Sequence, residues 1–298
     1  MSWINAFELL CYAITAMFLW DVIRRKSREE LLLFLSAAIA GFALELLAVR
    51  VTDIYHYSPD FYLSIGFRPY QFPFFGGLMW GGLTVYGLRI AKRLKMNSLM
   101  TALVTGWLIV TMDILLDVAA IRLDGGFWVW EGRPISLEIT HHMFMSVIWV
   151  NFLGYMFETP AMVFISMKTA EKRSRLSGWK QMLASVGIGV CGVAFVGAAS
   201  GISLLLNTVT DEWFACITFM LLWCFVFAMI VRREIKPEKR VSLQESRDVP
   251  VLVYWTAMYG FCIAALVRLG IASAAPVYFI FGIIMGAGTL YLAAAGGE

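Results

Sequence analysis

Apolar stretches of about 20 residues recur along the whole chain, and this feature constrains the fold most. A helix of that length is what crosses the hydrocarbon core of a bilayer. The 298 residues are 60% hydrophobic and 15% charged, with a mean hydropathy of +0.75, a balance outside the range of soluble domains. The sequence therefore predicts an all-α, polytopic membrane bundle of eight or nine helices. The nine predicted spans are 3–22, 31–50, 71–90, 98–121, 142–167, 181–206, 213–231, 250–270 and 275–293.

The basic residues predict the orientation of these spans. Of the 24 Lys and Arg residues, 19 lie in four alternate segments, 24–30, 89–95, 168–180 and 232–247. Cytoplasmic loops of membrane proteins carry such an excess. We therefore expect a multi-pass protein of the cell membrane, with its N-terminus outside and its C-terminus in the cytoplasm. The net charge of +3 then reflects topology, and no nucleic-acid partner is expected.

We expect residues 1–298 to form one membrane domain with two unequal halves. Acids within spans and aromatic-rich outer loops concentrate in residues 1–170, which we interpret as the working half. The spans in residues 181–298 contain few charged residues. Their Gly, Ala and Ser residues allow close helix packing, so we expect this half to complete the bundle. The five cysteines all lie inside spans, which predicts small apolar packing residues and no disulfides.

Among the carboxyl groups inside predicted spans, three are candidates for chemistry: Glu45, Asp113 and Asp117. Each costs roughly 2.5–3.5 kcal/mol on insertion scales if it is charged at the centre of a helix. Asp113 and Asp117 are four residues apart and share one helix face, about 6 Å apart along the axis. Pairing with Arg50 or Arg122 would lower this cost. Protonation is the other possibility, because a carboxyl group without a cationic partner stays neutral in a low-dielectric environment.

Aromatic pairs follow two of these acids. The segment from Glu45 contains Tyr55 and Tyr57, and the segment from Asp117 contains Trp128 and Trp130. The two segments align with one inserted residue, which indicates either a parallel internal repeat with a site at its interface or two similar helix exits. A neutral carboxylic acid beside π-faces suits protonation of an isolated C=C bond, because the rings stabilise the resulting carbocation. Alternatively, the aromatics form only an interfacial belt.

Other chemistries fit the sequence less well. His141 and His142 follow Glu138, but His56 is the only other histidine, too few for a histidine-rich oxygenase. We expect the histidine pair to form hydrogen bonds at the outer rim or to pass protons, and we predict no metal and no redox cofactor. The sequence contains no P-loop, Rossmann or G-x-S-x-G motif.

Residues 40–160 resemble the integral-membrane carotenoid biosynthesis proteins, a family that includes carotenoid and bacterioruberin hydratases. The resemblance rests on Glu45 with a Tyr-x-Tyr loop, on Leu116-Asp117, on a Trp-x-Trp loop, and on Asn151-Phe152 with Gly154-Tyr155. Val118 stands where the family has Pro, Tyr155 stands where it has Trp, and "SVIWVN" replaces a Gly-Val-Pro step. These departures are compatible with a different polyene substrate or with lost catalysis.

The resemblance implies a carotenoid-modifying enzyme, a hydratase of the lyase class or a related cyclase, acting on a carotenoid or other long isoprenoid among membrane lipids. Asp117 and Glu45 are expected to be the acid and the residue that orients water, in either order, while Asp113 tunes their protonation and Asn151 helps to place water. The substrate-binding aromatics are expected to be Tyr55, Tyr57, Trp128, Trp130, Trp80 and Tyr155. A pigment-binding subunit without chemistry and a proton-coupled transporter remain alternatives. Either a homo-oligomer or a membrane complex is compatible with the sequence.

Overall fold

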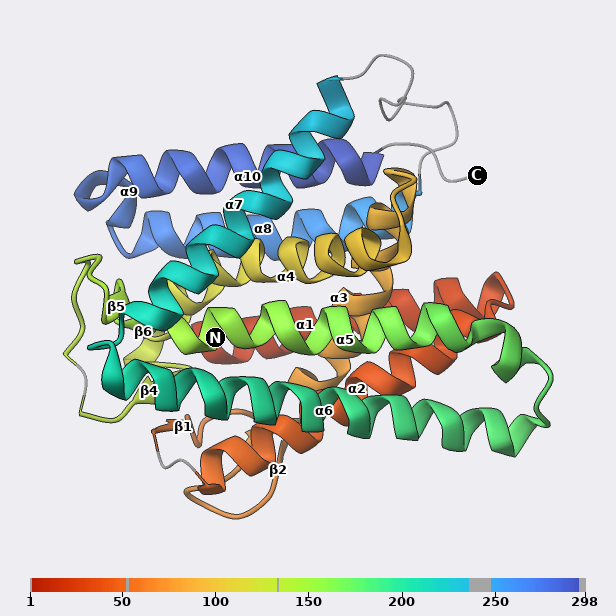
Figure 1. Ribbon diagram of the computed structural model, residues 1–298. Coiled ribbons are helices and arrows are strands. Elements are labelled where there is room, and N and C mark those ends of the chain that lie inside the picture. The colour runs from red at the N-terminus through yellow and green to blue at the C-terminus, as the bar shows by residue number, and fades with distance from the viewer. Residues whose placement is uncertain (1, 52–53, 133, 236–247, 295–298) are drawn as a thin grey trace.

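The fold is a bundle of long helices (Figure 1). The computed structural model describes residues 2–51, 54–132, 134–235 and 248–294. In order, the helices are α1 (Trp3–Arg24), α2 (Arg28–Val51), α3 (Phe74–Arg93), α4 (Ser98–Ala120), α5 (Trp149–Ser174), α6 (Gly178–Val209), α7 (Trp213–Ile235), α8 (Val249–Arg268), α9 (Ile271–Ala274) and α10 (Pro276–Ala294), with a short 3-10 helix η1 (Leu123–Gly125).

Seven of these helices are long and apolar enough to cross a membrane: α1, α2, α4, α6, α7, α8 and α10. The other two long helices, α3 and α5, are packed among them, α3 against α2 and α4, and α5 against α4 and α6. The prediction of an all-α, polytopic membrane bundle is confirmed. The five cysteines are free, as predicted.

Three small antiparallel sheets connect the helices at one end of the bundle. They pair β1 (Tyr55–Tyr57) with β4 (Trp128–Trp130), β2 (Ser64–Ile65) with β3 (Phe72–Pro73), and β5 (Met143–Phe144) with β6 (Val147–Ile148). The fifth span was predicted from residue 142, but α5 begins only at Trp149. The reason is a two-residue turn at Met145 and Ser146, whose φ angles of 49° and 73° reverse the backbone into a hairpin.

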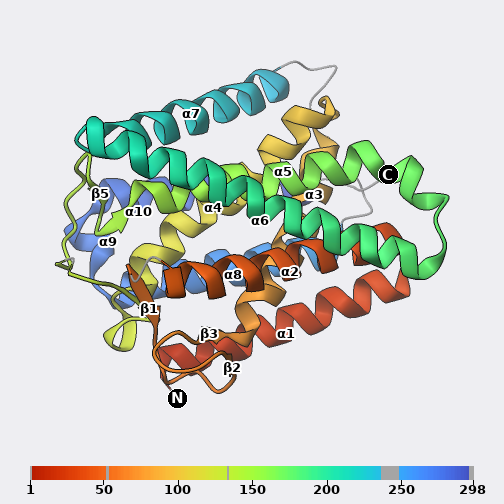
Figure 2. The ribbon, with the colours of Figure 1, turned by 60° about the horizontal axis from the view of Figure 1, so that its bottom comes forward.

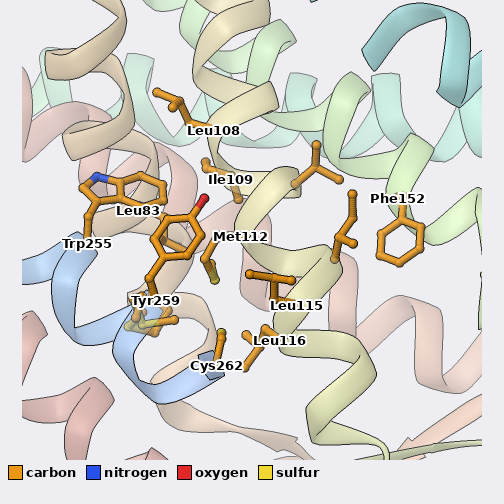
Figure 3. Packing of buried hydrophobic residues seen from close by; sticks show 14 of the residues in the cluster. Leu83, Leu108, Ile109, Met112, Leu115, Leu116, Phe152, Trp255, Tyr259 and Cys262 are labelled. Carbon is orange, nitrogen blue, oxygen red and sulfur yellow. The ribbon is translucent and has the colours of Figure 1, made fainter. Parts of the chain in front are cut away.

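Helix α4 is the central element of the bundle. Twenty of its 23 residues are buried, and it packs against α3, α5, α7, α8 and α10. In Figure 3, Leu108, Ile109, Met112, Leu115 and Leu116 of α4 lie among Trp255, Tyr259 and Cys262 of α8 and Phe152 of α5. Polar side chains on α4 are therefore enclosed by protein.

Close helix contacts depend on glycine at particular positions. A Cβ atom at Gly77 of α3 would lie 2.4 Å from the ring of Phe42 in α2, and one at Gly189 of α6 would lie 2.5 Å from the carbonyl oxygen of Ser36 in α2. The close packing expected from the Gly, Ala and Ser residues of 181–298 is therefore present at Gly189. By contrast, Gly197 and Gly201 of the same helix face open space.

The two ends of the bundle differ in chemistry. In both Figure 1 and Figure 2, the β-sheets and α9 gather at one end, whereas the α1–α2 and α5–α6 turns lie at the other. Ion pairs join the helices at this second end, with Arg89 and Arg25 contacting Asp21 at 2.7 and 2.8 Å and Arg25 contacting Asp248 at 2.9 Å. We call the two ends the sheet end and the basic end.

Candidate functional site

The sheet of β1 and β4 brings the two aromatic pairs together. Tyr55 lies opposite Trp130 and Tyr57 opposite Trp128 in the antiparallel register. The ring centroids are 4.9 Å apart in the first pair and 5.9 Å in the second. Because β1 follows α2 and β4 follows α4, this sheet joins the ends of the two helices that carry the acids.

Glu45 of α2 is held by the tyrosines of this sheet. Both phenol hydroxyls donate to the same carboxylate oxygen, Oε2, Tyr55 at 2.5 Å and Tyr57 at 2.8 Å. Burial raises the pKa of both phenols well above the ordinary value, so they remain protonated donors. The orientation of Glu45 therefore depends on a strand that is ten and twelve residues away in sequence.

The pair on α4 forms the second part of the site. Asn151 of α5 donates its side-chain amide to Asp117 Oδ2 at 2.6 Å. Asp113 lies one helical turn before Asp117 on the same face of α4, and its buried Oδ2 atom has no hydrogen-bond partner among the described residues. Two buried carboxyl groups this close repel each other when both are charged, which favours one proton on the pair.

A cavity of about 80 Å³ connects the two parts. Its lining includes Glu45 and Asp113 together with the aromatic rings of Tyr57, Trp80, Trp128 and Tyr155. Asp117 lies one helical turn beyond Asp113 and is not among the lining residues of this cavity, and the rings of Trp80 and Tyr155 stack with their centroids 4.7 Å apart. A cavity of this size holds two or three water molecules, at roughly 30 Å³ each. A polyene end therefore enters only if lining side chains move.

The comparison with known proteins identifies the family. A model described as "Carotenoid biosynthesis protein" matches residues 5–223. The chain belongs to the carotenoid biosynthesis protein family. The match extends on both sides of the resemblance found from motifs, and it covers α2, β1, α4, β4 and α5. No curated protein and no solved structure shows a significant match to the chain.

In this family member, the structure brings all ten predicted site residues to one region near the sheet end. Of the two ways in which the acids could lower their cost, pairing with arginine is not found among the described residues. The Arg122 guanidinium donates to the backbone carbonyls of Val118, Ser136 and Met145, and Arg50 is exposed. Arg122 instead fixes the loop after α4. Among the described residues, no cationic side chain forms an ion pair with Glu45, Asp113 or Asp117.

The aromatic residues do not form a simple belt at the lipid surface. Tyr57 and Trp130 are both only 7% exposed. Trp128 is half-buried and contacts both Tyr57 and Phe127. These rings therefore face protein, although their assignment to substrate binding stays a prediction.

The sequence analysis assigned no role to Glu158 of α5. It is 0% exposed, and neither carboxyl oxygen has a hydrogen-bond partner among the described residues. It lies seven residues after Asn151 and three after Tyr155, so the three share one face of α5. That spacing was the signal available in the sequence. Glu158 is also close enough to Glu45 to interact with it electrostatically.

Proposed function

We propose that this protein adds water to a terminal C=C bond of a carotenoid or another long isoprenoid. The observation that carries the proposal is the buried pair of Asp113 and Asp117 on one face of α4. Asp113 shares a cavity with Glu45, and no cationic side chain among the residues described forms an ion pair with these acids. A buried carboxyl pair of this kind retains a transferable proton at neutral pH, whereas an acid paired with arginine does not.

The proposed reaction begins with transfer of the proton of the Asp113–Asp117 pair, through Asp113 at the cavity wall, to the less substituted carbon of the alkene. The π-bond breaks, a C–H bond forms, and the other carbon becomes a tertiary cation. Tyr57, Trp80, Trp128 and Tyr155 line the cavity and stabilise this charge through their π-faces. Water then forms the C–O bond.

The Glu45 carboxylate accepts the proton that this water loses, so the net change is addition of one water molecule. Glu45 is suited to this step because two tyrosines hold its Oε2 atom and fix the direction of the carboxyl group. Asn151 donates to Asp117 through its amide nitrogen, which leaves its carbonyl oxygen able to accept a hydrogen bond from water. If an internal alkene captures the cation instead, the same residues perform a cyclisation.

A second candidate is a pigment-binding protein without chemistry. A separate cavity of about 460 Å³ lies between α4, α5, α7 and α10, and its wall is almost entirely apolar. Its aromatic lining residues are Phe144, Trp149, Phe152, Phe219, Trp223, Tyr278 and Phe281. This volume is typical of ligand sites, and its wall contains Ile114 of α4, next to Asp113 in sequence.

A proton-coupled transporter is favoured less. Carriers of this kind have helices broken in the middle of the membrane. Within the described part of the chain, the long helices are continuous, and α5 passes through Pro160 without interruption.

Pigment extraction and mass analysis test the proposal, using cells with and without the chain. In ¹⁸O-labelled water, we expect a polyene product that gains one labelled hydroxyl group, because the nucleophile is solvent. Unlabelled oxygen in the product would overturn hydration. An unchanged pigment that nevertheless copurifies with the protein would support the binding function.

We further propose that the protein lies in the cell membrane with its basic end in the cytoplasm. Cysteines introduced at Lys180 and Ile135, in a background without the native cysteines, test this orientation with an impermeant reagent. We expect labelling from outside only at position 135. These positions are exposed and avoid Gly132, whose φ of +65° disfavours other residues. Equal labelling at both would contradict the orientation.

A further inference from the structure

Two histidines and two acids meet at the sheet end, outside the carboxyl site. His141 and His142 precede β5, and Asp211 and Glu212 form the turn between α6 and α7. His141 Nε2 lies 3.4 Å from Asp211 Oδ2, and His142 Nδ1 lies 3.1 Å from Glu212 Oε2. One ligand atom from each of His141, His142 and Asp211 lies within 4.8 Å of the others.

We propose that His141, His142 and Asp211 bind a divalent transition-metal ion, with Zn²⁺ as the best match. Two imidazole nitrogens and a carboxylate oxygen form a ligand set typical of zinc. Zinc bonds of about 2.0–2.1 Å in a tetrahedron place neighbouring ligand atoms roughly 3.3 Å apart. The 3.4 Å separation between His141 and Asp211 is close to that spacing.

The surroundings of the two rings support this assignment. Glu212 beside Nδ1 of His142 reproduces the carboxylate–histidine contact that orients metal-binding imidazoles and leaves Nε2 for the ion. His141 stacks on Trp213, with centroids 4.3 Å apart and an interplanar angle of 3°. Its Nε2 atom is buried and has no hydrogen-bond partner in the described part of the chain. The ring is thus fixed while this nitrogen remains available.

The backbone of the turn aims the acids at the histidines. Asp211 and Glu212 have φ angles of 49° and 64°, a left-handed conformation that residues other than glycine adopt rarely. The amide of Glu212 donates to the carbonyl of Asn207 at 2.9 Å, which closes the turn onto the end of α6. A strained backbone conformation of this kind persists where the surrounding contacts compensate for its cost, and it is often found at functional sites.

A bound ion would join the α6–α7 turn to the segment before β5. The segment before β5 contributes Ile139 to the wall of the apolar cavity of about 460 Å³, and α7, which follows the turn, contributes Phe219. The ion would therefore fix α7 against the hairpin that leads into α5. This role is independent of the proposed hydration, since Glu45, Asp113 and Asp117 are not part of the cluster.

Metal binding by the full chain tests the proposal. The protein is purified in detergent without a polyhistidine tag, stripped with a chelator and dialysed against micromolar Zn²⁺. We expect about one Zn²⁺ per chain and a rise in melting temperature on adding Zn²⁺. Bound Co²⁺ should show the visible absorption of a tetrahedral site. Absence of saturable binding to the wild type would overturn the proposal.

Variants separate this site from adventitious binding. His141→Ala with His142→Ala should remove both the bound Zn²⁺ and the gain in melting temperature, and Glu212→Ala should weaken binding by about 10- to 100-fold. Asp211→Asn provides a second test because its side chain is 79% exposed, so this variant should fold while losing affinity. His56→Ala is the matched control, since this third histidine pairs with Glu131 elsewhere. Equal loss in the His56 control, or full retention in the double variant, would overturn the proposal.

Discussion

Two groups of buried acids lie toward opposite ends of the bundle, and they differ in what surrounds them. At the basic end, Asp21 and Asp248 contact Arg25, Arg89 and Arg93. Toward the sheet end, Glu8 accepts hydrogen bonds from the backbone amides of Tyr62 and Leu63, whereas four other buried or half-buried acids have no cationic partner among the described residues. This second group consists of Glu45, Asp113, Asp117 and Glu158.

The difference between the two groups distinguishes an acid that stabilises the fold from an acid that can take part in a reaction. Arginine beside Asp21 stabilises the charged carboxylate, which then holds α1 and α3 together. Without such a partner, an acid lowers its cost by keeping a proton or, as at Glu45, by accepting hydrogen bonds from two tyrosine hydroxyls. A protonated acid contributes little to the architecture, but it can transfer a proton. We therefore expect substitutions in the first group to reduce stability and substitutions in the second to reduce turnover.

The largest expected effect is the loss of turnover in Asp117→Asn. The amide keeps the shape of the side chain and one hydrogen bond, but it has no transferable proton. General acid catalysis typically contributes about 10²–10⁴-fold, so hydrated product should fall by that factor while the protein still inserts. Pigment analysis by mass measures the product.

Asp21→Asn is the matched control for Asp117→Asn. It should lower the yield of folded protein but leave product per folded chain unchanged. A normal product level in Asp117→Asn would contradict the proton-transfer mechanism.

Arg89→Met should produce the largest loss of stability. It leaves the carboxylate of Asp21, which is 0% exposed, with fewer cationic partners. Removing one partner of a buried ion pair costs about 3–5 kcal/mol, and we expect the lower end of that range because Arg25 still contacts Asp21. Unfolding in detergent measures the change, and Asp113→Asn should shift the same transition far less. Equal destabilisation by both variants would remove the distinction between the two groups.

Tyr57→Phe should have an intermediate effect on turnover. Glu45 would lose one of the two hydroxyl donors that hold its Oε2 atom. A hydrogen bond to a charged group contributes about 1.5 kcal/mol or more, which corresponds to roughly a tenfold drop in product formation. The exposed Tyr62, in the loop before β2, serves as control, because Tyr62→Phe should leave the rate unchanged. Unchanged turnover in Tyr57→Phe would mean that the orientation of Glu45 does not limit the reaction.

Trp130→Leu should have the smallest effect of these substitutions. One aromatic ring beside Tyr55 is lost, while the apolar character of the position persists. A cation–π contact contributes about 0.5–2 kcal/mol, so product formation should drop several-fold. Trp20→Leu is the control, since Trp20 is 59% exposed and lies beside Arg24. A loss as large as that of Asp117→Asn would indicate that Trp130 supports the fold of the sheet rather than the cation alone.

Local sequence was sufficient to predict the helices and the separation of charge between the ends. A span of apolar residues is recognisable within a window of 20 positions, and Asp113 and Asp117 share a face because of helical periodicity alone. The same periodicity puts Asn151, Tyr155 and Glu158 on one face of α5, although no role was predicted for Glu158. It could not indicate that Glu158 would lack a partner, because that depends on the helices packed around it.

Tertiary structure decided which residues meet. The antiparallel pairing of Tyr55 with Trp130 joins segments 75 residues apart, and it depends on α3 and α4 returning the chain to the same end. The contact between His142 and Glu212 joins residues 70 apart in the same way. Pairing of Arg122 with the acids was one of two possibilities from the sequence, yet Arg122 binds the carbonyls of Ser136 and Met145. Backbone carbonyls left without partners in a loop compete for a guanidinium as strongly as a neutral acid does, and only the folded chain brings them within its reach.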